Sequence, residues 1–132
     1  MIDRLVYEHL LTELHTARID GPLDRLCALF APDVQFRIAG ASDGKPISIN
    51  AQGSDAVRPW LAMLLKTFRV NDYRLQTRLI DGDRATVHWS ADIHSRITGS
   101  RVPTELVDII EIRELRIISY AEFFVPRWVT SL

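Results

Sequence analysis

Two carboxylates near the C-terminal end of the chain are the residues best suited to chemistry. Asp108 interrupts the apolar run of residues 106–110, and Glu122 follows Tyr120 in a second strand-like segment. An ionised carboxylate in an apolar interior is so costly that such a group is paired, hydrogen-bonded or kept protonated by a raised pKa. Enzymes use raised pKa values to make acids that work near neutrality. The pattern therefore predicts a pocket with acid–base groups, but it does not identify a reaction.

Hydrophobic periodicity places both carboxylates in the strand-rich part of an α+β chain. Apolar residues recur at helical spacing first and alternate later, so helices should precede an antiparallel sheet. We expect helices over residues 2–18, 23–30 and 54–67, and strands over residues 34–38, 73–80, 84–98, 104–113 and 116–124. Residues 39–53 are rich in Gly, Ser, Asp and Pro and are expected to form a loop or flap, in which residues 47–49 form at most a short strand.

The long strand over residues 84–98 has one apolar and one polar face. Ala85, Val87, Trp89, Ala91 and Ile93 alternate with Thr86, His88, Ser90, Asp92 and His94. We expect the apolar face to turn inward. His88 and His94 would lie about 20 Å apart along a strand, and Asp92 with His94 supplies only two ligands where zinc usually takes three or four. Neither a metal site nor a cofactor is predicted.

Aromatic side chains are candidates for lining a ligand site, although core packing is the commoner role for such residues. Trp89 lies on the expected inner face, and Trp60, Trp128 and Phe36 are further candidates. His15, beside Leu14 on the first helix, is a candidate pocket group, although a histidine among polar neighbours more often lies at the surface.

Composition limits the class of protein. The chain has 132 residues, of which 47% are hydrophobic, a formal net charge of −1 and one cysteine, Cys27. This length suits a single domain over residues 1–132. We expect no nucleic-acid partner, because the sequence contains no basic run that could bind along a phosphate backbone. We expect no membrane partner, because no apolar run reaches about 20 residues. The lone cysteine and the charged N-terminus favour a soluble, cytoplasmic protein.

Several segments together resemble a known family. Residues 20–26 with residues 29–36, and the segment Gly53-Ser54-Asp55-Ala56-Val57-Arg58, resemble nuclear transport factor 2-like proteins of the SnoaL-like and ketosteroid-isomerase-like branch. The resemblance covers nearly the whole chain. It implies a cone-shaped barrel, in which a strongly curved sheet wraps around the helices and encloses a mostly apolar pocket. It also implies a homodimer that pairs through the outer face of the sheet. The fold alone does not specify a reaction.

The resemblance assigns family roles to individual positions. Asp108 takes the place of the carboxylic acid in the ketosteroid isomerase oxyanion hole, an acid that its apolar site keeps neutral. Ile38 stands where that enzyme has its general base, and Leu14 where it has a tyrosine, so steroid isomerisation by that mechanism is not expected. The segment Tyr120-Ala121-Glu122-Phe123-Phe124 resembles the last strand of limonene-epoxide-hydrolase-like members, whose carboxylate activates water.

The turn between the last two strands decides whether the carboxylates share a face. A three-residue loop over residues 113–115, which the resemblance favours, places Asp108 opposite Tyr120. It directs one set of residues inward, namely Asp108, Ile110, Ile118, Tyr120 and Glu122. A two-residue loop would send Glu122 outward.

The sequence therefore predicts a pocket for a hydrophobic, cyclic small molecule. Asp108, Glu122 and Tyr120 are the predicted catalytic residues, for isomerisation, cyclisation or hydration. The predicted lining residues are Leu14, Phe36, Ile38, Trp60, Trp89 and Ile110. The alternative is a non-catalytic ligand-binding or dimerisation module, in which a buried Arg or Tyr holds Asp108 and Glu122 is a rim charge.

Overall fold

Three helices and one six-stranded sheet form the structure, a computed structural model that describes residues 4–42 and 44–127. The helices are α1 (Arg4–Asp20), α2 (Leu23–Cys27) and α3 (Ser54–Thr67). The strands are β1 (Phe30–Ser42), β2 (Lys45–Gln52), β3 (Phe68–Asp81), β4 (Arg84–Ser95), β5 (Arg101–Arg113) and β6 (Arg116–Pro126). The predicted α+β class is confirmed. Trp128, a candidate for lining the ligand site, lies outside the described residues.

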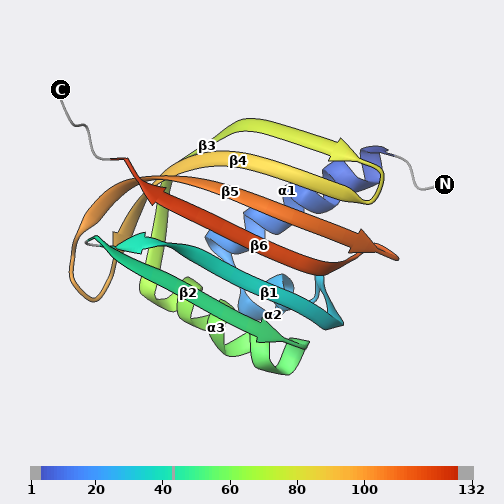
Figure 1. Ribbon diagram of the computed structural model, residues 1–132, viewed down its shortest axis with the longest axis horizontal. Coiled ribbons are helices and arrows are strands. Elements are labelled where there is room, and N and C mark those ends of the chain that lie inside the picture. The colour runs from blue at the N-terminus through green and yellow to red at the C-terminus, as the bar shows by residue number, and fades with distance from the viewer. Residues whose placement is uncertain (1–3, 43, 128–132) are drawn as a thin grey trace.

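The strands lie in the order β2-β1-β6-β5-β4-β3, and all helices lie behind the sheet in the view of Figure 1. Every neighbouring pair is antiparallel except β1 and β6, which are parallel. The last strand therefore lies at the centre of the sheet, between β1 and β5. This topology places Glu122 on β6 next to Asp108 on β5.

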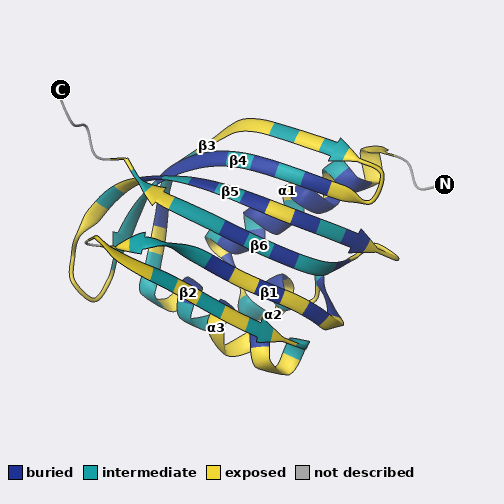
Figure 2. Cartoon of the chain, in the orientation of Figure 1, coloured by how far each residue is buried: buried dark blue, intermediate teal, exposed yellow. Residues whose placement is uncertain are grey.

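The core lies between the curved sheet and the helices. Leu11, Leu14 and Ala17 of α1 are fully or almost fully buried, as their helical spacing predicts. The strands alternate between buried and exposed residues along the sheet, most clearly on β1 and β5 (Figure 2). Within the described residues no helix is long and apolar enough to span a membrane.

The segment expected to be a loop, residues 39–53, is instead mostly β-hairpin. β1 continues to Ser42, and β2 pairs with it from Gln52 to Lys45. The prediction was wrong because backbone pairing along the edge of the sheet overrides the turn-like composition of this segment. Ile47 and Ile49, the only alternating apolar pair here, are the partly buried residues of that hairpin arm, together with Ala51.

The turn between β5 and β6 differs from the predicted three-residue loop. Arg113 pairs with Arg116 across the two residues Glu114 and Leu115, both of which have positive φ. A two-residue loop alone would turn Glu122 outward, but an irregularity in β6 between the partners of Ile112 and Glu111 inserts one residue. The inserted residue turns Glu122 back toward the inner face of the sheet.

Two details of the predicted register are corrected by this insertion. Asp108 lies opposite Glu122, and not opposite Tyr120. Ile117 is fully buried, whereas Ile118, which was expected to face inward, is only partly buried. The predicted shared face of Asp108, Tyr120 and Glu122 is nonetheless confirmed, since all three side chains are buried.

Candidate functional site

Asp108 has no exposed surface, and its hydrogen-bond partners come from two other elements. The indole Nε1 of Trp89 on β4 donates to Oδ2 of Asp108 at 3.0 Å. Nε2 of His15 on α1 lies 2.8 Å from the same oxygen, and it donates in the tautomer that carries its proton on Nε2. The other oxygen, Oδ1, has no hydrogen-bond partner within the described residues. Asp108 is thus held between a helix and a strand.

Glu122 belongs to a second buried group beside Asp108. The Tyr120 hydroxyl donates to Oε1 of Glu122 at 3.1 Å, and Nη2 of Arg18 on α1 donates to Oε2 at 3.4 Å. Arg18 and Glu122 are both at least nine-tenths buried. A buried charge pair is stable only with such hydrogen bonds. α1 therefore supplies a partner to each carboxylate, His15 to Asp108 and Arg18 to Glu122.

Burial raises the pKa of the Glu122 carboxyl above its ordinary value. The Arg18 charge opposes this rise, whereas the Asp108 carboxylate reinforces it. Burial also raises the pKa of Tyr120 well above its ordinary value, with help from Asp108 and Glu122. Tyr120 therefore keeps its proton and remains a donor. Glu122 moves toward the range in which a carboxyl group both accepts and donates protons near neutrality.

A cavity of about 380 Å³ opens beside this second group. Its wall comes from every strand of the sheet and from α1, α3 and the loop between β4 and β5. The lining residues are Arg18, Ile38, Ala41, Ser42, Ile47, Leu64, Thr67, Phe68, Ile93, Ser95, Ile97, Thr98, Ser100, Val102, Thr104, Leu106, Glu122, Phe124 and Pro126. Most are apolar. Arg18 and Glu122 are the charged groups among these lining residues, so they define its polar end.

Two of the residues predicted for the site, Glu122 and Ile38, line this cavity. Four more are buried in the core without lining the cavity, namely Leu14, Trp89, Ile110 and Asp108. Phe36 and Tyr120 stack on each other at 5.6 Å and contribute to the wall of a separate hollow of about 450 Å³. That hollow contains neither carboxylate.

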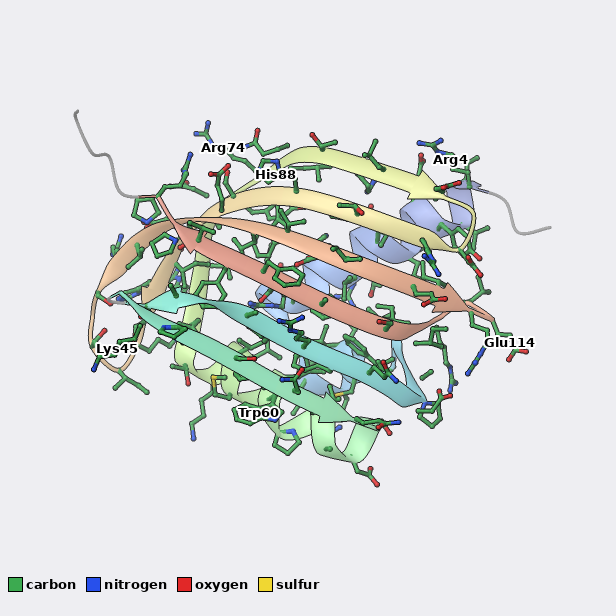
Figure 3. The ribbon with its side chains drawn as sticks, in the orientation of Figure 1. Arg4, Lys45, Trp60, Arg74, His88 and Glu114 are labelled. Atoms are coloured by element: carbon green, nitrogen blue, oxygen red, sulfur yellow. The ribbon has the colours of Figure 1, made fainter. Side chains whose placement is uncertain are left out.

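Trp60 was predicted to line the pocket, and its position does not match that role. It lies on α3 (Figure 3). The residue is 37% exposed and is absent from the cavity wall. The buried face of α3 consists of Val57, Leu61 and Leu64, and Trp60 lies at the edge of that face.

The polar face of β4 points away from the cavity. Its outward side chain His88 interacts with Glu105 at 3.0 Å, whereas Val87 and Trp89 on either side are fully buried. Asp92 and His94 are partly exposed. The described residues contain no group of three or more His, Cys, Asp or Glu side chains that could hold a metal ion.

The sequence prediction missed Arg18 and assigned His15 mainly to the surface. Both are buried on the inner face of α1. Their spacing contains the signal, since Leu11, Leu14, His15 and Arg18 follow the i, i+3, i+4, i+7 pattern of one helix face. A cation on an otherwise apolar face needs a buried partner, and Glu122 is that partner.

Solved structures with the same architecture include proteins of several kinds. A candidate isomerase from Bacillus subtilis has a TM-score of 0.78 at 18% identity, over 94% of this chain and 89% of that chain. An NTF2-like protein from Burkholderia xenovorans has a TM-score of 0.75 at 17% identity, over 94% of this chain and 92% of that chain. An LEH-like epoxide hydrolase from M. tuberculosis has a TM-score of 0.71 at 12% identity, over 91% of this chain and 83% of that chain. At these identities the likeness establishes the fold.

Among curated proteins none matches the sequence significantly. The model of the SnoaL-like domain, by contrast, matches residues 11–120, which include the site from His15 to Tyr120 but not Glu122. The family resemblance read from the sequence is thereby confirmed. This chain belongs to the SnoaL-like family and has the nuclear transport factor 2-like fold of the ketosteroid-isomerase-like proteins.

Proposed function

We propose that the protein binds a hydrophobic, cyclic small molecule in the 380 Å³ cavity and isomerises, cyclises or hydrates it by proton transfer at Glu122. One observation carries the proposal. A buried carboxyl group whose pKa is raised by burial lies in the wall of an open, mostly apolar cavity. This combination is typical of active sites. Related structures include a candidate isomerase and an epoxide hydrolase, whose reactions fall in the same range.

In this proposal Glu122 exchanges a proton with the ligand or with a water molecule beside it. The Tyr120 hydroxyl and Arg18 orient its two oxygens, one each. Both donors stabilise the ionised form, so Glu122 can receive a proton and return it at a different atom. Asp108 does not reach the cavity wall, and its bonds to His15 and Trp89 give it a positioning role next to Glu122.

Blocking the cavity should abolish ligand binding. Ile47 is partly buried in the cavity wall on the edge strand β2, so Ile47→Trp fills the space with little disturbance of the core. We expect cyclic ketones and epoxides, such as 2-tetralone and cyclohexene oxide, to shift amide resonances around Ile38 and Phe124 in wild-type protein. NMR titration of Ile47→Trp should show no such shifts.

Leu79→Trp is the matched control, because Leu79 is 62% exposed and is not part of the cavity wall. It should bind the same compounds as the wild type. Identical binding by Ile47→Trp would place the ligands elsewhere and contradict the proposal.

The alternative is a non-catalytic binding module, and the burial of Asp108 away from the cavity favours it. This carboxylate is fully buried, bonds to His15 and Trp89, and does not line the cavity. The module would bind the same ligands without changing them. Product analysis by mass spectrometry and NMR after incubation with the compounds that bind separates the two functions.

We further propose that the protein is a homodimer that pairs through the outer face of the sheet. Ile109 and Val125 are each at least half exposed, and they lie on the neighbouring strands β5 and β6. Sedimentation equilibrium at micromolar concentration should give twice the 15.1 kDa chain mass. Ile109→Lys should give a folded monomer, since it replaces an exposed apolar side chain on the central strand β5 by a charge. A monomeric wild type would contradict the dimer.

A further inference from the structure

Arg18 has more hydrogen-bonding capacity than its protein partners use. Its Nη2 donates to Glu122, but its Nε and Nη1 have no partner within the described residues. These two atoms carry three of the five N–H bonds of a guanidinium group. Only 5% of the side chain is exposed, so bulk water does not satisfy the remaining donors. Buried unsatisfied donors are costly and call for an explanation.

The charge balance of the cavity wall favours an anion. Arg18 is the cation among the described lining residues and Glu122 the anion. Burial lowers the pKa of Arg18, but Glu122, Tyr120 and Asp108 more than compensate, so the guanidinium stays charged. Burial raises the pKa of Glu122, so burial disfavours the negative charge of this carboxyl group. Arg18 is therefore the group of the wall to which a ligand anion would bind.

Four of the six hydroxyl groups in the cavity wall bond to other groups of the protein. Thr104 donates to the backbone carbonyl of Val102, and the hydroxyls of Thr98 and Ser100 bond to each other. Ser95 Oγ accepts from the backbone N–H groups of Ile97 and Thr98. Apart from the hydroxyls of Ser42 and Thr67, the rest of the uncharged wall is aliphatic and aromatic. The cavity thus combines an apolar space with one strong, buried cationic donor.

We propose that the ligand of this cavity is an apolar carboxylic acid, whose carboxylate is held by the free N–H groups of Arg18 while its ring or chain fills the apolar part. A guanidinium can serve two carboxylates at once, because its donors lie along separate edges of one plane. Arg18 would then bridge Glu122 and the ligand. The inference rests on the proposed function, since it specifies the substrate class for the same cavity.

Isothermal titration calorimetry with 1-naphthoate and 1-naphthamide tests this assignment. The two probes share a ring system and differ in charge at one group. Wild-type protein should bind naphthoate at least ten times more tightly than naphthamide. The Arg18→Met/Glu122→Gln double variant should bind both probes about equally. It removes both members of the buried pair, a change that proteins often tolerate without loss of stability, so it should fold even where Arg18→Met alone does not.

Arg37→Met is the matched control, because Arg37 is exposed on β1 and lies over the ring of Phe123. It should keep the full preference for naphthoate. Equal binding of the two probes by the wild type, or a preference that persists in the double variant, would overturn the carboxylate assignment and leave the proposed function intact. Failure of the wild type to bind naphthoate, naphthamide or any cyclic ketone or epoxide would overturn both.

Discussion

Glu122→Gln is expected to lower turnover of a bound substrate by about 100-fold or more, while folding and ligand affinity change little. General acid–base catalysis by one side chain typically contributes about 10²–10⁴ in rate, and an amide cannot take over proton transfer. Gln keeps the shape of the side chain; its oxygen can accept from Arg18 while its NH2 group donates to the hydroxyl oxygen of Tyr120. The measurement is kcat on the compound that the cavity binds, with affinity from calorimetry.

Glu105→Gln is the matched control for this substitution. Glu105 lies on the outer face of β5, where it interacts with His88, and it is not part of the cavity wall. Its removal should leave turnover unchanged. Wild-type turnover in Glu122→Gln would exclude Glu122 as the proton-transfer group.

Asp108→Ala is expected to lower the free energy of unfolding by about 3–5 kcal/mol, because it removes the acceptor shared by His15 and Trp89. The two ring nitrogens would be left buried without a partner. Asp108→Asn should cost only about 1 kcal/mol, since its amide oxygen can accept both bonds. Urea unfolding of the three proteins at neutral pH measures these differences.

The comparison of the two Asp108 variants shows whether the acceptor oxygen or the negative charge of this residue stabilises the protein. A small cost for Asn shows that the acceptor oxygen matters and the negative charge does not. If Asn destabilises the protein as much as Ala does, Asp108 is an ionised structural acid, and its predicted role as a proton donor is wrong. His15→Ala in combination with each variant gives the coupling energy between the two side chains.

The order and class of the elements could be predicted from periodicity, because the helices and central strands each bury one regular face. The strand β2 could not, since only Ile47 and Ile49 alternate in a segment of turn-forming residues. Its backbone pairing with β1 is a tertiary effect. The inward face of Glu122 was predicted correctly from a wrong loop length, because the inserted residue in β6 cancels the effect of the two-residue turn.

The partners of the two carboxylates could not be predicted from local pattern. Asp108 and Glu122 lie 93 and 104 residues from His15 and Arg18, so only the packing of α1 against the sheet brings them together. The helical spacing of His15 and Arg18 with Leu11 marks them as inward-facing, but it does not indicate which carboxylate each would meet. The topology also decides that Glu122, and not Asp108, reaches the cavity.

Proton transfer at Glu122 requires a carboxyl group with a raised pKa at the wall of an open cavity. The most direct test is ¹³C NMR titration of the Glu122 side-chain carboxyl in folded protein, assigned by comparison with Glu122→Gln. We expect a midpoint above the ordinary pKa of 4.5, because burial and Asp108 outweigh Arg18 and Tyr120. A midpoint at or below that value would show a permanently ionised partner of Arg18 and would contradict the proposed proton transfer.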